Sequence, residues 1–379
     1  MIKKRGQGLV RAGDTDFLKD GISGVTIETR KIADPPVKPT EFENVQLNLF
    51  RNFLCNTEEE RERFSNAIDL WDSVPRYSVS RQAMNKAREN GRFLENHTAT
   101  FQYRQRTYTC TISPARVADL DGNQRDFYPS ANEELVEDAL RKLAADQHAG
   151  FFDKPNSRSG VVFSLYALRE ELSKRGHSRS YQEIVLALNI LSKSIIEIAA
   201  QNAGKGEAIA ISAYLPSLVA VSKSRLKDDP TAKWAAQFHP FVTGSIDQVT
   251  YRQFNYHLMM SHSTQLARWL HKQLVLKYTF AELSKPFDMR YSTIKRDSGL
   301  LNSYSRERAA IEALETAFQD LKERDILSSF TRTDNTGPRN KILDVVFKIW
   351  PSIAFVREVK AANKRQAGAK PVGIGGRSG

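Results

Sequence analysis

The sequence predicts an α+β fold that is mainly helical, with two similar units in tandem behind a flexible N-terminal arm. Hydrophobic residues make up 40% and charged residues 26% of the 379 positions, which is typical of a globular chain long enough for two or three domains. The order helix, short strand, two helices, two strands can be read twice along the chain. Residues 1–45 are instead rich in glycine and proline without hydrophobic periodicity, which favours a flexible arm.

The arm ends in a short peptide at residues 46–50, with the sequence Gln-Leu-Asn-Leu-Phe. Leu47, Leu49 and Phe50 would fill an apolar pocket on a partner, and Gln46 would add a directional hydrogen bond. The peptide resembles the one by which bacterial replication proteins bind the DNA polymerase sliding clamp. We therefore interpret these four side chains as clamp-binding. An ordinary amphipathic strand or hydrophobic staple is the alternative interpretation.

Residues 51–128 are expected to form helices and a β-hairpin. Thr57 and Glu60 form a capping box in front of a helix, whose apolar positions follow at Phe64, Ile68 and Trp71. A second helix is expected from Ser80 to Asn90. The alternation that follows predicts a hairpin that turns near residues 104–106 and has its apolar positions at Phe101, Tyr103, Tyr108, Cys110 and Ile112.

The first repeated unit spans residues 129–226. Its expected elements are a helix at Leu135–Ala145, a strand at Val161–Phe163, a helix capped by Ser164 and stopped by Gly176, a helix opened by the capping box of Ser180 and Glu183, and strands at Ile195–Ile198 and Ala208–Ala213. A polar, glycine-rich tip at residues 201–206 separates the two strands. Helix, strand, helix-turn-helix and β-ribbon in this order are the plan of a winged helix.

The second unit, residues 245–356, follows a linker at residues 227–244 and has the same plan. Its expected elements are a helix at Thr250–Tyr278, a strand at Phe287–Tyr291, a helix from Ser292 to Gly299, a helix from Ser305 with a core stripe at Ile311, Leu314, Phe318 and Leu321, and two strands around a tip at Asp334–Asn340. We expect residues 357–379 to be a basic, disordered tail. The chain is therefore predicted to hold two tandem winged-helix domains.

The net charge of +12 and a sequence pI near 9.5 favour a polyanionic partner. In a helix-turn-helix, the first turn of the second helix enters the major groove. The DNA-binding candidates of the first unit are Arg179, Ser180, Tyr181 and Gln182, with Lys205 at its wing tip. Those of the second unit are Ser303, Tyr304, Ser305, Arg306 and Arg308, with Lys295 and Arg296 on the preceding helix and Arg339 and Lys341 at the wing tip.

Other classes of protein are disfavoured by what the sequence lacks. The longest apolar stretch, residues 209–221, is broken by Pro216, so no membrane span is expected. Two cysteines cannot make a disulfide framework or a zinc site, which is typical of a reducing cytoplasm. No phosphate-binding loop is present, and His257 and His262 lie five apart, a poor spacing for a metal. We expect no enzymatic activity, no metal and no cofactor.

Several segments resemble one family, the theta-type plasmid replication initiators, which include the iteron-binding Rep and TrfA-like proteins. The similarity covers residues 40–365 and is most evident at Ile112–Ala115, Tyr128–Ser130, Glu133–Leu140, Thr250–Tyr256, Leu266–Leu270 and Arg296–Leu300.

This resemblance implies a protein that binds direct repeats in double-stranded origin DNA and recruits the host replisome, with the host initiator and helicase among its partners. Related initiators have a resting dimer that must become monomeric, with the first winged unit as its interface. In this chain the strands at Ile195–Ile198 and Ala208–Ala213 would form such an interface, and the sequence leaves open whether the protein is a monomer or a homodimer. A winged-helix transcriptional repressor is the alternative, and the clamp-like peptide argues against it because a repressor has no use for a sliding clamp.

Overall fold

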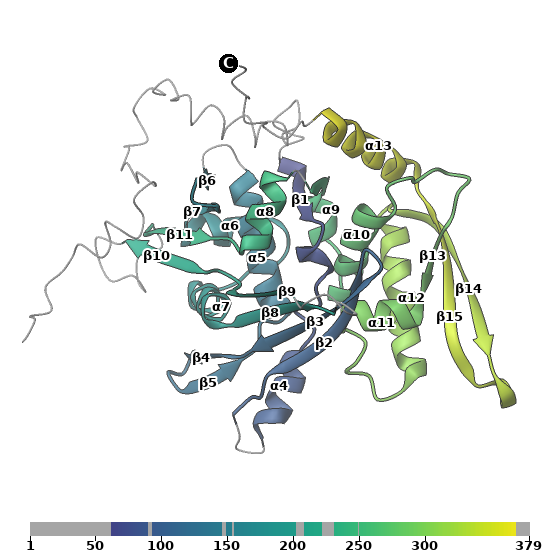
Figure 1. Cartoon of the computed structure of the whole chain (residues 1–379), viewed down its shortest axis with the longest axis horizontal. Helices are drawn as coiled ribbons and strands as arrows, with labels where there is room; N and C mark the ends of the chain where they lie inside the picture. Colours follow the sequence, from purple (N-terminus) through teal and green to yellow (C-terminus); the bar gives the residue numbers. More distant parts are fainter. Residues whose placement is uncertain are drawn as a thin grey trace, which may run out of the picture. The chain divides into compact units, whose positions relative to one another are not determined.

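The fold is α+β, with several antiparallel sheets and helices packed around them (Figure 1). The structure is a computed structural model, and it describes residues 62–89, 93–145, 149–153, 155–201, 208–221, 231–248 and 250–368. All of them belong to one compact body, Val45–Gly379. The α+β class is confirmed. The described residues are shared between helices and strands more evenly than a mainly helical fold would have them.

The N-terminal elements differ from expectation at two places, a strand where a helix was expected and a second hairpin, which was not expected, over residues 115–127. They are β1 (Phe64–Ile68), η1 (Trp71–Ser73), α4 (Arg81–Arg88), β2 (His97–Tyr103), β3 (Arg106–Ser113), β4 (Ala115–Ala118) and β5 (Gln124–Phe127). The predicted helix through Phe64, Ile68 and Trp71 is wrong, because β1 pairs antiparallel with β12 (Tyr251–Asn255). A spacing of four residues places two side chains on one face of a helix and also on one face of a strand. The spacing alone could not separate the two.

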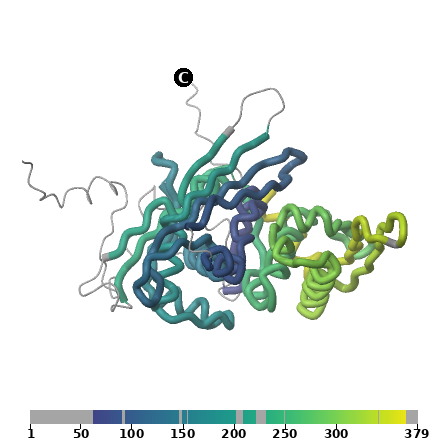
Figure 2. The backbone as a smooth tube through the Cα atoms, turned by 90° about the horizontal axis from the view of Figure 1, so that it is seen from below, coloured from purple at the N-terminus to yellow at the C-terminus, as the bar shows by residue number. Residues whose placement is uncertain are grey.

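The central part contains two four-stranded sheets. Its elements are α5 (Ala131–Ala145), β6 (Gly150–Asp153), β7 (Arg158–Ser164), α6 (Leu165–Lys174), α7 (Tyr181–Lys193), β8 (Ile195–Ala200), β9 (Ala208–Ala213), β10 (Ser217–Val221), β11 (Lys233–Gln237) and α8 (Pro240–Asp247). One sheet has the strand order β2-β3-β8-β9, and the other β10-β11-β7-β6. Figure 2 shows the blue and teal strands of the first sheet side by side. Strand β11 and helix α8 thus occupy much of the segment that we expected to be a linker.

The C-terminal half contains a three-stranded sheet and two helices that pack beside it. Its elements are β12, α9 (Tyr256–Met260), α10 (Gln265–Lys277), β13 (Phe287–Arg290), α11 (Tyr291–Ser298), α12 (Glu307–Glu323), β14 (Leu327–Thr336), η2 (Pro338–Asn340), β15 (Ile342–Pro351) and α13 (Ile353–Gly368). The sheet order is β13-β15-β14. The expected long helix over residues 250–278 is wrong in its first part, where β12 pairs with β1. The core stripe at Ile311, Leu314, Phe318 and Leu321 is confirmed, since all four side chains are buried.

Helix α13 corrects the expectation of a disordered tail from residue 357. Its side chains Phe355, Val356 and Val359 are buried, and Arg252 of β12 donates a hydrogen bond of 2.9 Å to Gln366. Basic residues on the exposed side of this helix gave the segment the composition of a tail, while its few apolar residues fix it to β12. The remaining residues 369–379 lie outside the described part of the chain.

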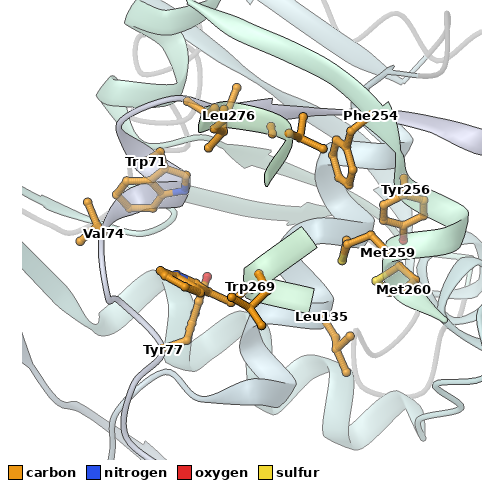
Figure 3. Packing of buried hydrophobic residues seen from close by; sticks show 14 of the residues in the cluster. Trp71, Val74, Tyr77, Leu135, Phe254, Tyr256, Met259, Met260, Trp269 and Leu276 are labelled. Atoms are coloured by element: carbon orange, nitrogen blue, oxygen red, sulfur yellow. The ribbon is translucent and has the colours of Figure 1, made fainter. Parts of the chain in front are cut away.

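Buried charges connect the N-terminal and C-terminal halves. Asp72 accepts hydrogen bonds from Arg76 (2.9 Å) and Arg141 (2.8 Å), and Lys272 of α10 reaches Asp138 of α5 at 2.6 Å. Burial alone would raise the pKa of Glu137, but the adjacent Arg76 and Arg141 guanidinium groups lower it to about 2. These charges lie next to a core that includes residues of both halves, as Figure 3 shows for Trp71, Tyr77 and Trp269.

Candidate nucleic-acid interface

The second unit presents an exposed turn between α11 and α12. Helix α11 ends at Gly299, whose φ of 66° lies in the left-handed region that glycine adopts without strain. A Cβ atom at this position would also lie only 2.6 Å from Cβ of Ser78. This glycine therefore both ends α11 and permits close packing, and residues 302–308 that follow, which include the first residues of α12, are exposed.

The predicted contact residues of this turn are exposed. Helix α12 begins after Arg306, which is its N-cap residue and makes no side-chain capping hydrogen bond. Arg308 forms an exposed pair with Glu312 at 3.2 Å, and 89% of its side chain is accessible. Ser303, Tyr304 and Ser305 are exposed as well. The turn thus presents two guanidinium groups and hydroxyl groups to a partner, and we name residues 302–308 the second leading turn.

The two basic residues predicted on α11 are engaged within the protein. Lys295 forms an ion pair with Glu307, and the Arg296 side chain lies on Asp297 with contacts of 2.7 Å and 3.1 Å. Asp297 is buried and also accepts a hydrogen bond of 3.0 Å from the Gln102 amide on β2. Arg296 therefore neutralises a carboxylate that joins α11 to β2, and its guanidinium group is only partly available for a phosphate.

Strands β14 and β15 form an exposed ribbon next to the second leading turn, and we call this ribbon the wing. Arg339 and Lys341 lie at its tip and are exposed, and Arg339 has a φ of 61° within η2. Further along β14, Arg332 pairs with Asp334 at 2.5 Å and with Glu315 of α12 at 3.2 Å. Arg339 and Lys341 thus lie at the free end of the wing, whereas Arg332 lies on its stem and is paired with carboxylates.

In the first unit, the corresponding turn at residues 178–182 is held more firmly. Ser180 and Glu183 form the predicted capping box, which is confirmed, and these hydrogen bonds lower the pKa of the Glu183 carboxyl. Arg179 donates a hydrogen bond to Asn132 Oδ1 at 2.5 Å, and Arg169 lies 4.8 Å from the centre of the Tyr181 ring. Gln182 is exposed. We name residues 178–182 the first leading turn.

Other predicted residues cannot be placed. Lys205 and the clamp-binding Gln46, Leu47, Leu49 and Phe50 lie outside the described residues.

The sequence did not single out some polar partners that shape the second leading turn. Glu307 binds both Lys295 and the Tyr291 hydroxyl, and Asp344 of β15 accepts hydrogen bonds of 3.0 Å and 2.7 Å from Ser292. Glu307 stood between two chosen arginines in the sequence. Its position on the first turn of a predicted recognition helix was the signal that could have identified it.

The sheet β2-β3-β8-β9 exposes isoleucine side chains on its outer face. Ile195 of β8 and Ile209 and Ile211 of β9 are 38%, 52% and 62% exposed. Strand β9 is also an edge strand, so its outer backbone groups are not paired within this sheet.

His262 lies between a second histidine and an aspartate. Its Nε2 atom lies 3.0 Å from Nδ1 of His271, and its Nδ1 atom lies 3.4 Å from Asp320. Burial lowers the pKa of His262 to about 4, so both rings are neutral at physiological pH. Across the described ranges, no group of three histidine, cysteine, aspartate or glutamate side chains could hold a metal ion. Likewise, no helix in the described part of the chain has the length and apolar character needed to cross a membrane.

The comparisons with known proteins give similarity in structure alone. No protein-family model and no curated protein match the chain. Crystal structures of domains 2 and 3 of RctB are similar to it, one with 10% identity over 69% of this chain and 93% of that chain at a TM-score of 0.45, and another with 10% identity over 70% and 95% at 0.40. The Pi initiator protein in complex with iteron DNA is similar with 11% identity over 77% and 99% of the two chains, at a TM-score of 0.32.

Proposed function

We propose that this protein is a non-enzymatic replication initiator that binds direct repeats in double-stranded DNA through two winged-helix units. The observation that carries the proposal is the second leading turn, which exposes Arg306 and Arg308 at the start of α12 beside the basic tip of the wing. A helix with this exposure fits the major groove, and the ribbon beside it fits the neighbouring backbone. The net charge of +12 would add attraction that does not depend on sequence.

The two units would have different parts in this complex. The second leading turn has arginines that can donate two hydrogen bonds to guanine O6 and N7. The first leading turn has Gln182 among its exposed polar side chains, and the amide of glutamine matches the edge of adenine. Most of the base discrimination is therefore assigned to the second unit.

Partners other than DNA would bind to segments outside the two leading turns. In the cytoplasm, the peptide at residues 46–50 would bind the sliding clamp and so recruit the host replisome to the origin. The exposed isoleucines on β8 and β9 would cover one another in a homodimer, since apolar side chains on an edge strand favour association.

The experiment that tests the proposal is a binding titration on duplexes that carry the direct repeats next to the gene, with shuffled duplexes for comparison. We expect the double variant R306A/R308A to lose about tenfold or more in affinity for the repeats and much less for shuffled DNA. The matched control is K322A, an exposed cation near the other end of α12. At about 1.5 Å per residue it lies more than about 20 Å from the leading turn.

Two results would count against the proposal. Equal losses on repeats and shuffled DNA would make the two arginines phosphate contacts without a role in sequence recognition. A wild-type protein that binds repeats and shuffled duplexes with the same affinity would remove the initiator function itself.

A further inference from the structure

A concave surface of about 650 Å³ lies between helices α11 and α12 and the start of β15. Tyr291, Ser292 and Lys295 line it from α11, Glu307 from α12, and Lys341 and Asp344 from the wing. The surface therefore lies directly beside the second leading turn. Among these side chains are two carboxylates, although a DNA-binding surface is expected to be basic.

The two carboxylates differ in how far their hydrogen-bonding capacity is used. Asp344 accepts hydrogen bonds from the amide and hydroxyl groups of Ser292 and from the Val345 amide at 2.9 Å. These bonds join the wing to α11, which is a sufficient structural reason for this carboxylate. Glu307 accepts from two side chains, the Tyr291 hydroxyl and the Lys295 ammonium group.

Glu307 keeps free capacity on the accessible side. An ionised carboxylate has about four positions that can accept a hydrogen bond, and two of them are used. The side chain of Glu307 is 64% exposed, against 30% for Lys295, so its free positions face solvent. The hydrogen bonds from Lys295 and Tyr291 also lower the pKa of this carboxyl, which keeps it ionised at neutral pH.

A fixed negative charge at this position has a cost in any complex with DNA. It repels phosphates and holds Lys295 away from them. The cost is offset if the carboxylate accepts a hydrogen bond from a base. In the major groove the cytosine edge carries an amino donor, whereas adenine places its N7 acceptor beside its amino group and would repel a carboxylate there.

We propose that Glu307 is a specificity-determining residue that accepts a hydrogen bond from the N4 amino group of a cytosine in the major groove. Tyr291 and Lys295 are positioning residues that hold its carboxylate in place. The inference rests on the proposed function, and it names one base that the second leading turn reads.

The test is selection of binding sequences from a pool of random duplexes by the full chain and three variants. The variants E307Q and E307A remove the charge, and E323Q is the matched control. Glu323 lies on the same helix, is exposed and also accepts a side-chain hydrogen bond, from Gln319 at 3.1 Å. Because Glu307 is exposed, the variants are expected to fold, and thermal unfolding checks this.

We expect the wild type and E323Q to recover the same motif. E307A should lose the preference for cytosine at one position, with the affinity ratio between cytosine and other bases falling about tenfold there. E307Q should move that preference toward adenine, because a glutamine amide pairs with the adenine edge.

The outcomes separate this inference from the proposed function. If E307A and E307Q recover the wild-type motif unchanged, or change affinity equally for all duplexes, Glu307 does not read a base. If the wild type recovers no motif at all, the proposed function fails and this inference fails with it.

Discussion

In the second unit the short strand β13 pairs with β15, so the wing and the short strand form one sheet of their own. In the first unit the corresponding strand β7 pairs with β6 and β11, while β8 and β9 extend the hairpin β2-β3. Both units contain a helix, a strand, two helices and two strands in this order, but the first unit also has β6 and β10, and its sheets include strands from outside it. The comparison shows that an order of elements read along the chain does not determine which strands pair.

The same contrast appears at the two leading turns. The first is held by a capping box, by Asn132 and by Arg169, whereas Arg306 in the second has no capping hydrogen bond to make. The second turn is therefore the better candidate for contacts with a partner. The first contributes more to the stability of its own unit.

The largest expected effect concerns the buried charges that join the two halves. K272A should lower the free energy of unfolding by about 3–5 kcal/mol, because it leaves Glu134 buried without its cation and Asp138 with Arg141 alone. Denaturant unfolding measures this. The control K285A removes an exposed pair with Glu282 and should cost about 1 kcal/mol or less. Similar losses for both variants would mean that the junction contributes no more than a surface pair.

A smaller effect should distinguish the two glycines between the paired helices. Gly176 and Gly299 both have positive φ, 82° and 66°, but a Cβ at Gly176 would meet no atom within 4 Å. We expect G176A to cost about 1 kcal/mol from backbone strain alone, and G299A to cost more because of the contact with Ser78. Thermal unfolding of the two variants gives the ranking, and an equal or reversed ranking would contradict the close packing of α11.

The smallest effect compares the two N-caps. S180A should lower the free energy of unfolding by about 1 kcal/mol, since it removes the capping hydrogen bond to the Glu183 amide. R306A removes no capping hydrogen bond, so its free energy of unfolding should stay within about 0.5 kcal/mol of that of the wild type. Both are measured by denaturant unfolding. If R306A destabilised the protein as much as S180A, the Arg306 side chain would stabilise the fold through a contact other than a capping hydrogen bond.

The sequence could predict features that depend on residues close to one another along the chain, and it could not predict features that depend on distant residues. The caps at Ser164 and Ser180 and the stripe on α12 depend on residues within a few positions of one another, and these predictions are confirmed. The pairing of β1 with β12 joins residues almost two hundred positions apart, and no local pattern contains it. Helix α13 was missed for a related reason, because its apolar residues make sense only against β12.

The same distinction between local and long-range contacts applies to the candidate site. Exposure of the second leading turn followed from its place between two helices. The engagement of Arg296 by Asp297 was visible as a neighbouring pair, but the further bond from Gln102 to that carboxylate was not. Likewise, the partners of Glu307 come from a different helix, so their convergence on one carboxylate required the fold.

The buried charges between α5 and α10 have a consequence for how a bound duplex could be spaced. If Lys272 and Asp138 keep these helices together, the span between the two leading turns stays constant. In the proposed complex, half a helical turn of DNA could be inserted between the two contacted grooves. The protein could not change the distance between its leading turns to match this insertion. It would have to be absorbed by twisting or bending of the DNA, at a cost that depends on the stiffness of the inserted base steps.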